Sequence, residues 1–176
     1  GKDDYDLIQG PVNHVNKEWN QLEFVLTKGY SKVTMNFRVA NDGVAFRYLV
    51  DADTDATDEA VVVTNETSSF TFADNATLWT LGYSSTYEAG GIDKRTMNDV
   101  KNANAWYSTP VLAETDAGWI LLSEASVFNT ENPYCASVYS TTSGSKALKV
   151  QFGRDLVGED DLGNHGMESK PTISRD

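Results

Sequence analysis

The sequence is short of the residues that most often identify a protein's chemistry. Its 176 residues include one cysteine, Cys135, and two histidines, His14 and His165. A single cysteine excludes an internal disulfide and a zinc site built from several thiolates. No G-x-S-x-G elbow marks a serine nucleophile, and nothing around either histidine marks it as a catalytic base. The sequence therefore favours none of the common triad or thiolate–metal enzymes.

Basic residues and long apolar runs are also scarce. The chain has 14 Lys and Arg against 26 Asp and Glu, a formal net charge of −12. So acidic a chain repels phosphate backbones and anionic membranes, and we expect no nucleic-acid partner. No apolar run approaches the roughly 20 residues of a membrane-spanning helix. A chain that opens at Gly1 is compatible with the removal of an export signal.

Apolar residues alternate with polar ones along much of the chain, which predicts strands with one buried face. The clearest example is residues 32–39, followed by Asn41-Asp42-Gly43 and a second alternating run at 44–50. Because Gly tolerates positive φ, this pattern predicts a β-hairpin. Further short strands are expected at 22–26, 61–63, 69–72, 78–81, 119–123, 136–140 and 148–152. The fold class predicted is all-β, an antiparallel β-sandwich.

Two segments depart from this pattern. Residues 96–105 have a weak helical periodicity, and their asparagines make a long loop an equal alternative. From Gly153 onward, acidic residues and glycines replace large apolar ones, so little surface is available to offset the entropy of ordering. We therefore expect a β-sandwich domain over residues 1–152 and an irregular tail over 153–176.

The acidic run at 51–59 has the alternating carboxylates of a calcium loop. An EF-hand needs glycine at its sixth position and a bidentate glutamate at its twelfth, where this chain has Ala56 and Val62. The pattern therefore favours a solvated acidic turn between two strands.

Aromatic residues are the richest candidates for binding. Trp79 and Trp119 lie within strand-like runs, where core packing is the expected role. Loop aromatics offer flat faces of the kind that stack on sugars. The candidate carbohydrate-binding residues in loops are Trp106, Tyr107, Tyr83 and Tyr87.

Glu124 is the acidic residue of greatest interest, since it follows an apolar strand at the rim of a sheet. A carboxylate in such low-dielectric surroundings must be paired, bound to a cation, or protonated. A structural ion pair with an arginine and a metal-binding role both remain open.

Several segments together resemble the N-terminal domain of glycoside hydrolase family 97. The most specific is Asn41-Asp42-Gly43-Val44-Ala45-Phe46-Arg47-Tyr48, and the resemblance runs in order from Trp19 to Ala125. The other segments are Trp19 to Phe24, Met35 to Val39, Phe70 to Phe72, Tyr87-Glu88, Pro110 to Leu112 and Gly118 to Ala125. Strands expected before the Trp19 region are missing or much reduced, and the tail does not lead recognisably into a barrel.

This resemblance implies a β-super-sandwich of the galactose-mutarotase-like type, which in the full enzymes packs against a catalytic (β/α)₈ barrel. Members hydrolyse α-glucosides or α-galactosides, and many are exported by gut Bacteroidetes. They use calcium, to which the N-terminal domain lends a glutamate; Glu124 is the matching position. The resemblance thus implies an exported protein, periplasmic or on the cell surface, with carbohydrate or a catalytic barrel as its partner.

Glycoside hydrolysis needs two carboxyl groups about 5–9.5 Å apart, and no motif here supplies such a pair. We therefore predict a non-catalytic accessory domain that is associated with carbohydrate. The alternatives are an exported protein-interaction domain and, ranked last, a mutarotase-type enzyme. The latter would need a histidine and a glutamate in one cleft.

Overall fold

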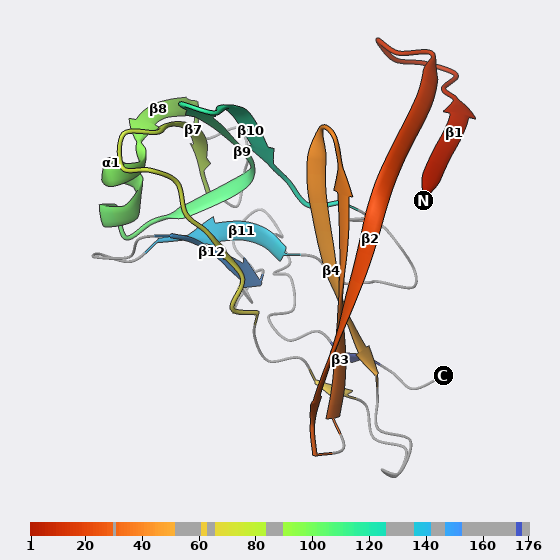
Figure 1. Ribbon diagram of the computed structural model, residues 1–176. Coiled ribbons are helices and arrows are strands. Elements are labelled where there is room, and N and C mark those ends of the chain that lie inside the picture. Colours follow the sequence, from red (N-terminus) through yellow and green to blue (C-terminus); the bar gives the residue numbers. More distant parts are fainter. Residues whose placement is uncertain are drawn as a thin grey trace, which may run out of the picture. The chain divides into compact units, whose positions relative to one another are not determined.

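The computed structural model describes residues 1–29, 31–51, 61–62, 66–83, 90–125, 136–141, 147–152 and 172–173. Within these residues the chain is mostly antiparallel β-structure with almost no helix, so the predicted all-β class is confirmed. The chain divides into two compact units, Gly1–Val61 with Ser174–Asp176, and Val62–Ile173 (Figure 1). The acidic run lies largely outside the described residues, as do His165 and nearly all of the tail.

The first unit is a four-stranded meander, in which each strand pairs with the next in the sequence. Its strands are β1 (Lys2–Asp6), β2 (His14–Lys28), β3 (Ser31–Ala40) and β4 (Gly43–Asp51). The strand β1 and the first part of β2 both lie before Trp19. The sequence predicts that strands in this region are missing or much reduced. The predicted hairpin is confirmed, with Ala40 paired to Gly43. Positive φ occurs at Gly29 (60°), between β2 and β3, and not at Gly43.

Period-two alternation gives this sheet one apolar face. Leu22 on β2, Phe37 on β3 and Phe46 on β4 share a register row. Phe37 contacts the rings of residues on both neighbouring strands, Phe24 at 5.9 Å and Phe46 at 5.8 Å between centroids. The exposed large apolar residues of this face are Leu22, Phe24, Leu26, Val39, Val44 and Tyr48. We call this set the exposed apolar face.

The opposite face of the same sheet is polar and internally bonded. Glu23 Oε1 accepts hydrogen bonds from Asn36 Nδ2 at 2.9 Å and from Gln21 Nε2 at 3.0 Å. Arg38 donates to Gln21 Oε1 and lies over the Trp19 ring, 5.0 Å from its centroid. These contacts satisfy Asn36, which is buried, and account for a polar residue at that position.

The second unit contains a seven-stranded antiparallel sheet. Its strand order is β6-β12-β11-β9-β7-β8, and β10 also pairs with β9. The strands are β6 (Ser69–Phe70), β7 (Thr77–Gly82), β8 (Ile92–Thr96), β9 (Trp106–Thr115), β10 (Gly118–Leu122), β11 (Ala136–Ser140) and β12 (Leu148–Phe152). A separate two-stranded pair joins β5 (Val61–Val62) to β13 (Thr172–Ile173).

The second unit also holds a short helix, α1 (Met97–Asn102), so part of the ambiguous 96–105 window is helical. Thr96 and Asp99 form a capping box: Asp99 N donates to Thr96 Oγ1 at 3.1 Å, and Thr96 N donates to the Asp99 carboxylate at 3.3 Å. Met97 and Val100 turn inward and are fully buried. Lys101 Nζ then ties the end of the helix to Asp74 at 2.8 Å.

The core of the second unit lies on one face of its sheet. Its fully buried side chains include Leu78, Val111 and Leu148 from three strands, and Met97 and Val100 from α1. At about 25 cal/mol per Å² of buried apolar surface, such residues each contribute on the order of 2 kcal/mol. Because successive side chains of a strand point to opposite faces, the residues between these core positions lie on the other face of the sheet.

Candidate functional site

The face of the second sheet opposite the core carries two pairs of aromatic rings. Along β7, Leu78 and Thr80 are buried, whereas Trp79 and Leu81 are only half-buried. Because side chains alternate along a strand, Trp79, Leu81 and the following Tyr83 point to the face away from the core. We define the aromatic face by Trp79, Tyr83, Trp106 and Trp119, together with Lys94.

The first pair is Trp79 with Trp119. Their ring centroids are 5.0 Å apart and their planes are tilted by 33°, within the range of offset stacking. Trp79 is on β7 and Trp119 on β10, so the rings meet over the intervening strand β9. The Lys94 ammonium lies 5.2 Å from the Trp79 centroid, a cation–π contact. Trp119 is 61% exposed, so the expectation that it belongs to the core is wrong.

The second pair is Tyr83 with Trp106, whose ring centroids are 6.2 Å apart. The Tyr83 amide donates to the Trp106 carbonyl at 2.8 Å, which continues the β7–β9 pairing by one residue beyond β7. The structure thus brings together two of the four aromatic residues singled out in the sequence. Trp106 is the first residue of β9 rather than part of a loop.

Tyr107 and Tyr87 do not join this pair. Tyr107 is only 3% exposed and belongs to the core, because it points to the opposite face of β9 from Trp106. Burial raises the pKa of the Tyr107 phenol, against the opposing effects of the Arg95 charge and of a hydrogen bond with Thr141. Tyr87 lies outside the described residues.

Glu124 follows β10 by two residues and is half-buried. It lies near enough to the buried phenol of Tyr139 for its charge to act on it. The pKa of Tyr139 is raised to about 12, first by burial and then by the negative charges of Glu124 and Glu66. Among the residues that the structure describes, no group of three or more His, Cys, Asp or Glu side chains is placed to hold a metal ion. The described residues around Glu124 therefore do not by themselves make a complete calcium site.

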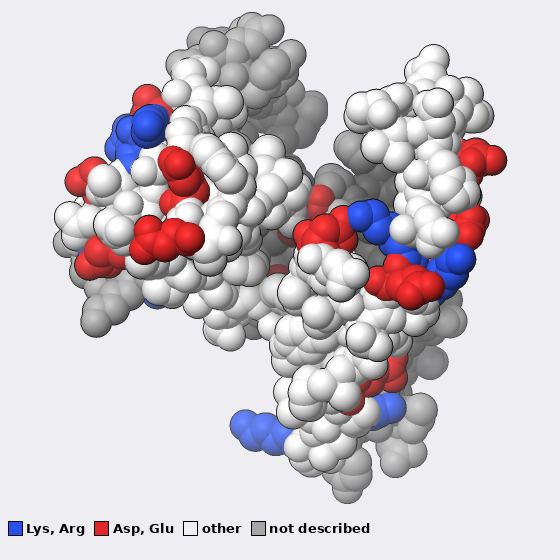
Figure 2. All heavy atoms as spheres, turned by 45° about the horizontal axis from the view of Figure 1, so that its top comes forward, with Lys and Arg blue, Asp and Glu red and all other residues white. Residues whose placement is uncertain are grey.

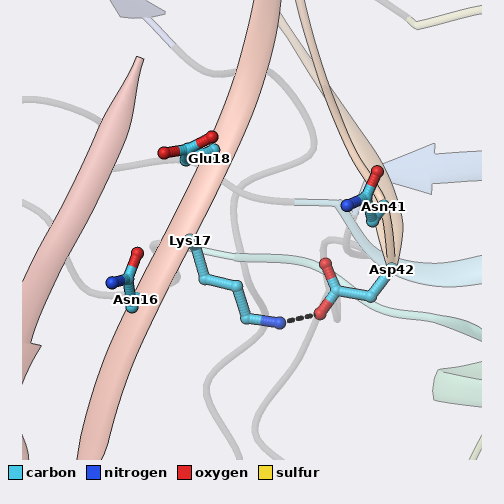
Figure 3. A pocket seen from close by; sticks show the side chains of 5 residues that line it. All are labelled: Asn16, Lys17, Glu18, Asn41 and Asp42. Carbon is cyan, nitrogen blue, oxygen red and sulfur yellow. Dashed lines mark hydrogen bonds and ion pairs between the residues drawn. The ribbon is translucent and has the colours of Figure 1, made fainter.

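A polar hollow of about 360 Å³ lies in the first unit (Figure 3). It is lined by Asn16, Lys17 and Glu18 of β2 and by Asn41 and Asp42 of the β3–β4 turn. Lys17 Nζ donates to the Asp42 carboxylate, and this bond, together with the lysine charge, lowers the Asp42 pKa. The hollow has no aromatic wall, so it offers hydrogen bonds without a stacking surface.

His14 does not build a catalytic pair with a glutamate. It is the first residue of β2, and its ring lies between Asp6 at 2.8 Å and Asp4 at 3.3 Å, both on β1. These contacts join the two strands at an exposed edge, which is a structural role.

The charge distribution agrees with the composition. Figure 2 shows acidic and basic side chains interspersed among neutral residues, with no continuous basic surface on the face in view. No described helix is long and apolar enough to span a membrane.

Together, the antiparallel sheets of the two units define an all-β protein. Residues 1–153 match the sequence profile of the family described as Glycosyl-hydrolase 97 N-terminal, so the chain belongs to that family. The match covers β1 through β12, which is wider than the Trp19–Ala125 resemblance visible in the sequence. Comparison with the curated proteins finds no match.

Proposed function

We propose that this chain is a non-catalytic domain that contacts carbohydrate through its aromatic face, in support of a glycan-hydrolysing site. The observation that carries the proposal is the Tyr83–Trp106 pair, which sits on the same sheet face as the exposed Trp119. Indole and phenol rings present flat apolar surfaces on which the C–H face of a pyranose can pack. Family membership supports the association with glycan hydrolysis, since full-length relatives join this domain to a catalytic one.

Tryptophan fluorescence tests this proposal. Titration with maltooligosaccharides and with α-galactosides up to millimolar concentration should change the emission of the wild-type chain saturably. Trp106→Ala should weaken the response, whereas Tyr5→Ala, which removes an exposed ring from β1, should leave it unchanged. Absence of any response at millimolar sugar would count against direct binding.

The same proposal predicts no glycosidase activity for the chain by itself, because the reaction needs two carboxyl groups across one glycosidic bond. Chromogenic α-glucosides and α-galactosides should not be cleaved faster than in buffer. Turnover that co-purifies with the folded chain and is lost in Glu124→Gln or Glu66→Gln would overturn the accessory role.

We further propose that Glu124 supplies one carboxylate to a calcium ion whose other ligands lie outside the described residues. Calcium takes six to eight oxygen ligands, so one carboxylate holds it weakly. Millimolar calcium should therefore move the melting temperature of this chain very little. A large shift that Glu124→Gln leaves intact would contradict the assignment. Export to the periplasm or cell surface is part of the same proposal.

A protein-docking role is the second candidate, and the exposed apolar face of the first unit favours it. Six large apolar side chains of one sheet face are exposed there, and such patches commonly mark interaction surfaces. Val44→Glu, at 66% exposure, should abolish association with a catalytic domain without loss of folding. Co-purification of both partners measures this, with Tyr5→Glu as the control.

A further inference from the structure

The aromatic face has two ring pairs set apart along one strand. Trp79 and Tyr83 are four residues apart on β7 and its one-residue extension, which corresponds to about 13 Å at the rise of a β-strand. Leu81 lies between them on the same face, and Ile92, its partner on β8, is 71% exposed. The rings therefore mark two positions of an elongated surface rather than the walls of one pocket.

The Trp79–Trp119 pair is held in place by contacts within the sheet. Trp79 is held between the Lys94 ammonium and the Trp119 ring, so Trp119 is the outermost member of the stack. Trp119 exposes 61% of its surface, and Leu121, two residues further along β10, exposes 62%. A ring held in this way loses little conformational entropy on binding.

The charges beside this stack balance. Lys94 pairs with Trp79 across β7–β8, and the exposed Glu114 pairs with Trp119 across β9–β10. One positive and one negative group leave the Trp79–Trp119 stack without net charge beside it and provide a hydrogen-bond donor and acceptors at its rim. This combination suits a neutral polyhydroxylated ligand better than an anionic or cationic one.

We propose that the aromatic face binds one extended neutral oligosaccharide along β7, with one sugar ring on Trp119 and another at the Tyr83–Trp106 pair. The inference rests on the proposed function and specifies its ligand as a chain of several sugar units rather than a monosaccharide. Leu81 and Ile92 contact the intervening units, and Glu114 and Lys94 hydrogen-bond to hydroxyl groups of the sugar unit on Trp119.

Calorimetry of the whole chain with sugars of increasing length tests this. Two series serve as probes, glucose to maltohexaose and galactose to stachyose. In at least one series the dissociation constant should fall about tenfold or more between the monosaccharide and the longest member, as expected when a second ring contact is added.

Variants at each end locate the two contacts. Trp119→Ala and Trp106→Ala should each weaken the longest sugar about tenfold, and Trp119→Phe, which retains a flat ring, should recover part of the loss. Tyr5→Ala is the control, and circular dichroism checks that each variant is folded.

The outcomes separate the two proposals. If sugars bind but length has no effect, or if Trp119→Ala binds as tightly as the wild type, the extended site is wrong while carbohydrate contact survives. If no sugar of either series binds the wild-type chain, both proposals are wrong.

Discussion

At the scale of single residues, burial decides what a side chain can do. Tyr107 and Trp106 are neighbours in the sequence, yet one is sealed in the core and the other pairs with Tyr83 on the aromatic face. Tyr139 is 4% exposed and packs edge-to-face against Phe70 at 5.8 Å. The charge of Glu124 acts on this buried phenol and helps to raise its pKa.

The raised pKa of Tyr139 predicts a loss of stability at alkaline pH. The unfolded phenol releases its proton near pH 10, but the folded phenol holds its proton up to about pH 12. Between these values the folded state binds more protons, so the free energy of unfolding falls as pH rises, by on the order of 3 kcal/mol in all. Below pH 10 this contribution is fully present.

Urea unfolding at pH 8 and pH 11 measures this effect. Tyr139→Phe should lose less stability between the two pH values than the wild type, because it removes the titrating group while keeping the ring. Tyr5→Phe, at an exposed position, should behave as the wild type does. An identical loss in Tyr139→Phe and the wild type would show that Tyr139 is not responsible.

At the scale of secondary-structure elements, short-range contacts set where each element begins. The helix α1 begins at Met97, because the side chain of its N-cap residue Thr96 accepts a hydrogen bond from the Asp99 amide and the Thr96 amide donates one to the Asp99 carboxylate. These hydrogen bonds from Thr96 are the main cause of the lowered pKa of Asp99. The helix is short, so its cap and its two buried residues, Met97 and Val100, determine whether it forms.

Removal of the cap should destabilise the second unit. Thr96→Ala should lower the free energy of unfolding by about 1 kcal/mol, while Thr96→Ser keeps the hydroxyl and should cost much less. Since ionised Asp99 is the form that Thr96 stabilises, the difference between Thr96→Ala and the wild type should narrow as pH falls through the folded pKa of Asp99. Chemical denaturation at pH 7 and in acid measures both effects. An equal loss for Thr96→Ser and Thr96→Ala would show that the hydroxyl is not the cause.

At the scale of the whole molecule, the excess of negative charge is the dominant electrostatic feature. A net charge of −12 on 176 residues repels itself in the folded state, and the exposed ion pairs such as Lys2–Asp4 offset little of it. The same charge makes association with other polyanions unfavourable.

Salt should therefore stabilise this chain. Raising sodium chloride from about 10 mM to 300 mM shortens the screening length from about 30 Å to under 10 Å, and the melting temperature should rise by a few degrees. Asp3→Lys makes the net charge two units less negative and should reduce the response. A melting temperature that falls with salt would mean that attractive pairs outweigh the repulsion.

Sequence reasoning worked best where one face of a strand is clearly apolar. The hairpin of β3 and β4, the all-β class and the family all follow from local alternation and from motifs that need no tertiary information. It was less informative at β10, where Trp119, Ile120, Leu121 and Leu122 are all apolar, so that periodicity cannot select the buried face.

The sequence by itself determined the strand-forming segments, because alternation of side chains is a property of the local chain. Only the tertiary structure decided which of two apolar faces is covered: Leu122 packs on the core and leaves Trp119 outward, and Tyr107 turns inward while Trp106 meets Tyr83. Burial depends on residues far away in the sequence, such as Val111 and Leu148, and no local pattern encodes their positions.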